Sequence, residues 1–127
     1  IPLFVKSIMK EIPAFINGDG EQTRDFTFVD NAVQINIKGM LTDNPEALGK
    51  VYNVAIGENF TVNYLYQACL DRLNSTFPAQ YREPRAGDIR NSLADISLAK
   101  KLLGYQPTKR FEDGLAETID FFKNKYA

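Results

Sequence analysis

Apolar residues recur every three or four positions in five segments of the chain, which is the spacing of helices with one buried face. The clearest case follows Thr61, a predicted helix cap, where the stripe consists of Val62, Leu65, Tyr66, Cys69, Leu70 and Leu73. The other predicted helices span residues 2–11, 30–41 (capped by Asp30) and 97–103 (capped by Ser97 and stopped by Gly104), with a last helix running from Leu115 to Tyr126.

Three short segments favour strands instead. Residues 14–17, 25–29 and 51–55 are apolar or alternate with period two, and the turn Gly18-Asp19-Gly20 follows the first of them. After Pro78 a polar, arginine-rich connection is expected to run to about Asp95. Because short strands and helices follow one another irregularly, the sequence predicts an α+β fold rather than a doubly wound sheet. Residues 1–127 are expected to form a single domain.

Composition excludes several classes of function. The 15 basic and 16 acidic residues give a net charge of −1, which disfavours binding to nucleic acid or to an anionic membrane. We expect a cytoplasmic protein, because there is no apolar run of membrane-spanning length and no signal-peptide pattern, and Cys69 has no second cysteine to pair with. The lack of histidine disfavours a metal site. The opening Ile-Pro-Leu-Phe predicts a piece of a longer protein.

Two arginines lie where glycine-bearing turns meet extended segments, in GDGEQTRDFTFVD (18–30) and PRAGDIRNSLAD (84–95). Arg24 precedes Asp25 and Arg85 precedes Asp88, so each has a carboxylate that could hold its side chain in place. A guanidinium presents a planar fork suited to two phosphate oxygens. Charge pattern alone favours a plainer interpretation, in which these are surface ion pairs that contribute about 0–1 kcal/mol each. Asp88 could alternatively accept hydrogen bonds from ribose hydroxyls.

Four longer sequence segments indicate a protein family more specifically than these Arg–Asp pairs do. They are INGDGEQTRDFTFVDN (16–31), VYNVAIGENFTV (51–62), PRAGDIRNSLADISLAKKLLGY (84–105) and FEDGLAETIDFF (111–122). With them the chain resembles the C-terminal, substrate-binding portion of the extended short-chain dehydrogenase/reductases. It is most similar to the NAD-dependent 4-epimerases that act on UDP-N-acetylglucosamine or UDP-glucose. The resemblance implies a small mixed α/β lobe without its Rossmann domain.

The resemblance also implies roles for individual residues. Arg24 and Arg85 correspond to arginines that grip the diphosphate of a UDP-sugar, and Asp88 corresponds to an acid that binds the uridine ribose. Ile16 and Phe26 lie where such enzymes enclose the nucleotide, partly through backbone atoms.

Two further residues are expected to hold the ligand-binding residues in place. Asp25 is one of them. Arg90 is the other, and it could either contact the ligand or form an internal salt bridge with a carboxylate such as Asp95.

No catalytic residue is expected in this chain. The family's hydride transfer implies a glycine-rich dinucleotide loop and a helical Tyr-x-x-x-Lys pair. Gly18 and Gly20 lack the third glycine and precede a predicted strand. The literal match from Tyr105 to Lys109 contains Pro107, which disfavours a helix. We therefore expect NAD to bind mainly to the missing N-terminal lobe, with no cofactor on this piece, and the piece alone to be inactive.

Other functions remain open at this point. The same lobe could serve another sugar-nucleotide reaction, such as dehydration, decarboxylation or reduction, or the chain could be a stand-alone, non-catalytic binding domain. The expected partners are the UDP-sugar and the missing Rossmann lobe. Apolar helix faces left uncovered could also drive self-association.

Overall fold

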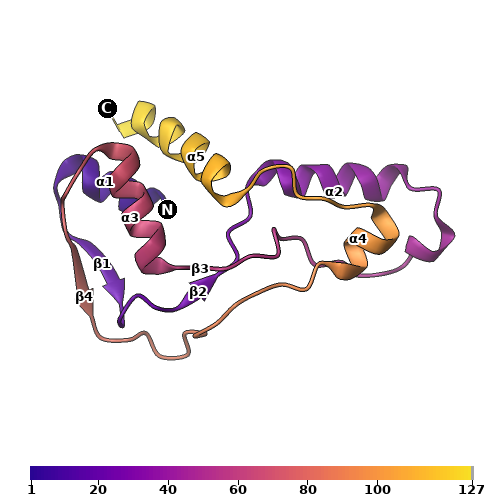
Figure 1. Cartoon of the computed structure of the whole chain (residues 1–127), viewed down its shortest axis with the longest axis horizontal. Coiled ribbons are helices and arrows are strands. Elements are labelled where there is room, and N and C mark those ends of the chain that lie inside the picture. Colours follow the sequence, from indigo (N-terminus) through magenta and orange to yellow (C-terminus); the bar gives the residue numbers. More distant parts are fainter. Residues whose placement is uncertain (127) are drawn as a thin grey trace. The chain divides into compact units, whose positions relative to one another are not determined.

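Helices and short strands follow one another irregularly in the computed structural model, which describes residues 1–126 (Figure 1). In chain order the elements are α1 (Pro2–Lys10), β1 (Ala14–Asn17), β2 (Thr23–Arg24), α2 (Val29–Leu41), the 3-10 turn η1 (Pro45–Ala47), β3 (Phe60–Thr61), α3 (Val62–Leu73), β4 (Ala79–Arg82), α4 (Ser97–Leu103) and α5 (Phe111–Tyr126). The predicted mixed α/β class is confirmed.

These elements form two compact units. Unit 1 contains residues 1–24 and 60–92 together with the chain from Leu115 onward. Unit 2 contains residues 25–59 and 93–114. The chain therefore passes from one unit to the other between Arg24 and Asp25, and helix α5 begins in unit 2 and continues in unit 1.

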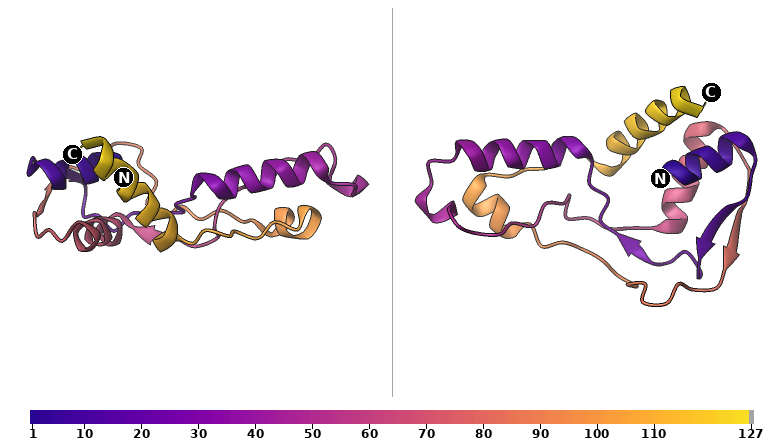
Figure 2. Two further views of the ribbon diagram at one scale, coloured as in Figure 1. Left: turned by 90° about the horizontal axis from the view of Figure 1, so that it is seen from above. Right: turned by 180° about the vertical axis from the view of Figure 1, so that it is seen from behind.

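Unit 1 is built on a parallel pair of strands, β1 and β4, in which Ala14 pairs with Ala79 and Asn17 with Arg82. Helices α1 and α3 lie side by side in this unit, as the views in Figures 1 and 2 agree. Their facing side chains are excluded from water: Val5 and Cys69 are both 0% exposed. Burial raises the pKa of the Cys69 thiol to about 11, so this cysteine is a core residue and a poor nucleophile at neutral pH.

Unit 2 encloses a small core of Ile35, Ala55, Ile96, Ala99 and Tyr105. The Tyr105 hydroxyl donates a 2.8 Å hydrogen bond to the carbonyl of Ala55 inside this core. A second buried polar residue in this unit is Asn31 near the start of α2, which is 0% exposed. Its side-chain oxygen accepts from the backbone N–H groups of Thr108 (3.0 Å) and Lys109 (3.2 Å), and its nitrogen donates to the Lys109 carbonyl (2.8 Å).

Locally determined elements follow the sequence prediction. Strand β1 has the predicted bounds, and the Thr61 hydroxyl caps α3 by accepting from the Tyr64 N–H at 3.0 Å. Helix α4 spans the predicted residues and ends at Gly104, whose backbone is left-handed. Its N-cap is Ile96 rather than the predicted Ser97, whose N–H donates to the Asp95 carboxylate at 2.8 Å.

Two predicted strands are absent from the described chain. Residues 25–28 and 51–55 form no ladder, and α2 begins at Val29, so Asp30 lies in its first turn rather than at its cap. The predicted 51–55 strand has no neighbouring strand to pair with, and Val51 is 91% exposed. The sequence does not predict strand β4, because its Ala-Gln-Tyr-Arg alternation covers only four mostly exposed residues at the start of a polar segment.

The apolar spacing of residues 30–41 predicts that Val33, Ile37, Met40 and Leu41 share a buried face, but all four are exposed. Val33 is 51% exposed, Met40 76% and Leu41 78%, whereas the buried residues of this helix are Asn31 and Ile35. None of the described helices combines the length and apolar character needed to cross a bilayer.

Candidate functional site

An exposed segment of unit 1, residues 83–91, carries most of the arginine-rich motif, and we call it the arginine loop. Backbone hydrogen bonds anchor both its ends: Gly18 N–H donates to the Arg82 carbonyl at 2.8 Å, and Thr23 N–H donates to the Arg90 carbonyl at 2.8 Å. Between these ends the Asp88 N–H closes a turn onto the Arg85 carbonyl at 3.1 Å. The loop is therefore held at its ends and by its own turn.

A hollow of about 490 Å³ lies against this loop. Residues 17–19 and Gln22 line one side of it, and residues 81–85 and 88–90 line the other. Arg85 and Asp88, two of the predicted ligand-binding residues, thus share one hollow. No ion pair of Arg85 is found among the described residues, so its guanidinium is available to an anion.

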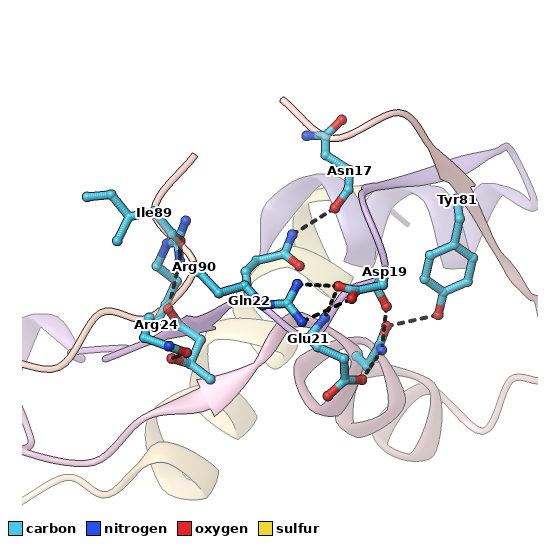
Figure 3. Close-up of polar contacts among 11 residues, drawn as sticks. Asn17, Asp19, Glu21, Gln22, Arg24, Tyr81, Ile89 and Arg90 are labelled. Atoms are coloured by element: carbon cyan, nitrogen blue, oxygen red, sulfur yellow. Dashed lines mark hydrogen bonds and ion pairs between the residues drawn. The ribbon is translucent and has the colours of Figure 1, made fainter. Parts of the chain in front are cut away.

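Arg24 is more tightly engaged than Arg85. Its guanidinium donates to the Asp88 carboxylate at 2.5 Å, to the Ile89 carbonyl at 2.6 Å and to its neighbour's carbonyl at 2.7 Å (Figure 3). The expectation that Asp25 holds Arg24 is wrong, because the carboxylate paired with the Arg24 guanidinium is that of Asp88. Asp25 instead accepts from the N–H groups of Ile56 (3.1 Å) and Gly57 (3.0 Å) in unit 2.

Arg90 forms an internal salt bridge, one of the two roles left open for it. The partner is Asp19 rather than Asp95: two guanidinium nitrogens donate to its two carboxylate oxygens at 2.7 and 3.0 Å (Figure 3). These bonds from Arg90, with the Glu21 N–H next in importance, lower the pKa of Asp19 to about 2. Asp19 is therefore ionised and paired at any physiological pH.

Arg24 does not line the hollow itself, and the two remaining predicted site residues, Ile16 and Phe26, also lie apart from its lining. Ile16 is only 1% exposed, so its side chain belongs to the core of unit 1, and its backbone pairs with Tyr81 of β4. Phe26 belongs to unit 2, where its ring packs against Phe111 with 5.6 Å between ring centroids.

Asn63 and Gln22 organise the turn beside the hollow, although nothing in the local sequence distinguishes them. The Asn63 amide donates to the Asp19 carbonyl at 2.9 Å, and its oxygen accepts from the Tyr81 hydroxyl at 2.9 Å. The Gln22 amide donates to the Asn17 carbonyl at 2.9 Å. Their role depends on residues distant in sequence, so local pattern could not have revealed it.

We expect Gly20→Ala to destabilise this turn strongly. Gly20 has a φ of +77°, and an added Cβ would lie 1.9 Å from the Asn63 side-chain oxygen, so the Asn63 hydrogen bonds must break. The expected loss is about 2–4 kcal/mol, combining left-handed strain with lost hydrogen bonds. Urea unfolding followed by circular dichroism measures it.

Gly87→Ala is the matched control, since Gly87 has the same φ of +77° with nothing within 4 Å of an added Cβ. Only the backbone strain of about 1–2 kcal/mol should remain there. Equal losses in the two variants would contradict the proposed steric conflict at Gly20.

The partial matches to a dinucleotide loop and to a Tyr-x-x-x-Lys pair do not have the geometry of those motifs. The turn at Gly18 and Gly20 leads into strand β2, whereas a dinucleotide loop leads into a helix. Tyr105 is 0% exposed with its hydroxyl bonded to Ala55, and Lys109 is not helical, so these two do not form the catalytic pair. No cluster of three metal-ligating side chains occurs within residues 1–126.

The chain is similar to known enzymes that act on nucleotide sugars. A UDP-glucose 4-epimerase from Mycolicibacterium smegmatis is 30% identical over 98% of this chain. The structure of a UDP-N-acetylglucosamine 4-epimerase from Methanobrevibacter ruminantium, in complex with UDP-N-acetylmuramic acid, is 36% identical over 98% of the chain with a TM-score of 0.88. A UDP-glucuronic acid 4-epimerase from Bacillus cereus, in complex with UDP-glucuronic acid and NAD, is 28% identical over 98% with a TM-score of 0.91.

The chain spans only 39% of the length of each of these relatives. Relatives of other activity also match, among them a UDP-N-acetyl-α-D-glucosaminuronate decarboxylase and a dTDP-glucose 4,6-dehydratase, at 26% and 29% identity. Residues 1–118 match the family described as GDP-mannose 4,6-dehydratase. The chain therefore belongs to this family, and its resemblance to the extended short-chain dehydrogenase/reductases is confirmed.

Proposed function

We propose that this chain is the UDP-sugar-binding portion of an NAD-dependent nucleotide-sugar 4-epimerase of the UDP-N-acetylglucosamine or UDP-glucose type. The observation that carries the proposal is the hollow in which Arg85, without an ion-pair partner among the described residues, lies close to Asp88. Structures of similar proteins in complex with UDP-sugars support the substrate class.

The chain's own residues would hold the substrate by its unreactive end. Arg85 would donate to diphosphate oxygens, with Arg24 joining it once phosphate replaces the carboxylate on its guanidinium. Asp88, thereby released, would accept from ribose hydroxyls. Contacts to the unreactive UDP moiety would orient the substrate, while the hexose would remain free to rotate. NAD, held by a Rossmann lobe outside the residues described here, would supply the hydride acceptor.

A second candidate is the same lobe in a sugar-nucleotide enzyme of another reaction type. The decarboxylase and dehydratase among the relatives favour it. Assaying the chain together with its Rossmann lobe separates the two. Interconversion of the 4-hydroxyl epimers of a UDP-hexose supports the epimerase, whereas loss of carbon dioxide or water from the sugar supports the alternative.

Titration of the isotope-labelled chain with UDP, observed by NMR, tests the proposed binding directly. Two charge-assisted contacts contribute about 1.5–3 kcal/mol each, against an association cost of about 4–15 kcal/mol. We therefore expect a dissociation constant of about 1 mM or weaker, with shifts at residues 85–90. Uridine, which lacks phosphate, is the control. Equal shifts with uridine, or none with UDP, would contradict a diphosphate site.

We also propose that the chain self-associates when it is alone, through the exposed face of α2. Val33, Met40 and Leu41 present an apolar surface there, and such surfaces in soluble proteins are commonly interaction sites. Sedimentation velocity should show the average mass rising with concentration, and Met40→Lys should reduce that rise. A concentration-independent monomer would contradict the proposal.

A further inference from the structure

The Asp19–Arg90 pair is one of two side-chain ion pairs that hold the arginine loop among the described residues; the other joins Arg24 to Asp88. The Asp19 and Arg90 side chains are both exposed, at 57% and 59%, so neither contributes to a core. Each guanidinium nitrogen involved meets its own carboxylate oxygen, and this two-point contact fixes orientation as well as distance. Asp19 lies on the Gly18–Gly20 turn, 71 residues earlier in the chain.

The pair has two consequences for the hollow that it borders. It adds a side-chain tie to the backbone bond between Thr23 and Arg90, so the loop carrying Arg85 is restrained at this end. It also neutralises a carboxylate that lines the hollow and would otherwise repel an anion.

We propose that Asp19 and Arg90 are positioning residues, which hold the arginine loop so that Arg85 faces a bound diphosphate. This inference rests on the proposed function. Neither residue touches the ligand; each acts through Arg85 by restricting the loop before binding, and less conformational freedom is then lost on association.

A direct contact between Arg90 and the diphosphate is the competing interpretation, and it predicts different results. Asp19→Asn would then release Arg90 and strengthen binding, and the unliganded loop would be unaffected. The double variant Asp19→Asn/Arg90→Gln removes the pair without changing the net charge, so it separates positioning from simple electrostatics.

The experiment compares the wild-type chain, Asp19→Asn, Arg90→Gln and the double variant by two measurements. One is UDP affinity from NMR titration; the other is hydrogen exchange of the Thr23 and Asp88 amides without ligand, since these amides bond to the loop. The matched control is Asp120→Asn/Arg72→Gln, which removes another exposed pair of unit 1, at 2.7 Å, whose two residues do not line the hollow.

The double variant should bind UDP about fivefold more weakly and its reporter amides should exchange about fivefold faster, the size expected of one exposed ion pair. The control should match wild type in both. Binding within twofold of wild type by the double variant would overturn the inference while leaving the proposed function intact. Tighter binding by Asp19→Asn with unchanged exchange would overturn it in favour of direct contact. No UDP binding by wild type would instead refute the proposed function, and exchange would still decide whether the pair holds the loop.

Discussion

Asn31→Ala should lower the free energy of unfolding of unit 2 by about 3 kcal/mol. The side chain is fully buried and satisfies two backbone N–H groups and one carbonyl of residues 108–109. Truncation leaves these groups without partners, and each unpaired buried group costs about 1–3 kcal/mol. Urea denaturation measures the loss, and hydrogen exchange of the Thr108 and Lys109 amides locates it.

Asn36→Ala provides a control on the same helix. Asn36 is exposed, and its amide donates only to the Ala32 carbonyl one turn earlier, at 2.7 Å. Its replacement should change stability by about 0.5 kcal/mol or less. If Asn31→Ala and Asn36→Ala were equally mild, the described hydrogen bonds of Asn31 would not stabilise unit 2.

Arg85→Ala should weaken UDP binding by about tenfold or more, the effect of losing one charge-assisted hydrogen-bonded contact. The side chain lines the hollow and has no ion-pair partner among the described residues, so its removal leaves no stranded carboxylate. Stability should therefore be unchanged, and the loss should appear only in the NMR titration with UDP.

Arg72→Ala serves as the comparison, because Arg72 is an exposed arginine of the same unit outside the hollow and pairs with Asp120. It removes the same charge, so any general electrostatic effect should appear in both variants. Equal affinities for UDP in Arg85→Ala and Arg72→Ala would exclude Arg85 from the site.

Features of the fold that depend on neighbouring residues were predictable from the sequence. The cap at Thr61 and the stripe from Leu65 to Leu70 lie within a few helical turns, and both are found as expected. Strand β4 was not predictable, because its ladder partner β1 lies about 65 residues away and its own alternation covers only four mostly exposed residues. The exposed face of α2 was misread because its apolar spacing does not say which face is covered.

In the candidate site, too, some features could be predicted from the sequence and others depend on residues far apart in the chain. Its residue types, Arg85 and Asp88 near a glycine turn, could be identified from chemistry and resemblance. Their partners could not: Arg24 meets Asp88 across 64 residues, and Arg90 meets Asp19 across 71. In the sequence, nearby aspartates looked equally suitable as ion-pair partners for these arginines. Only the three-dimensional structure identifies which aspartate pairs with which arginine.

The carboxylate of Asp88 on Arg24 makes this arginine different from Arg85 toward any incoming anion. Arg24 already carries an internal counter-ion, so a phosphate arriving there displaces one negative group with another and releases few dissolved ions. Arg85 has no internal counter-ion among the described residues, so a phosphate that binds there displaces dissolved anions instead. Added electrolyte should consequently compete with ligand mainly at Arg85, and substituting Arg85 should flatten the ionic-strength dependence of binding more than substituting Arg24 does.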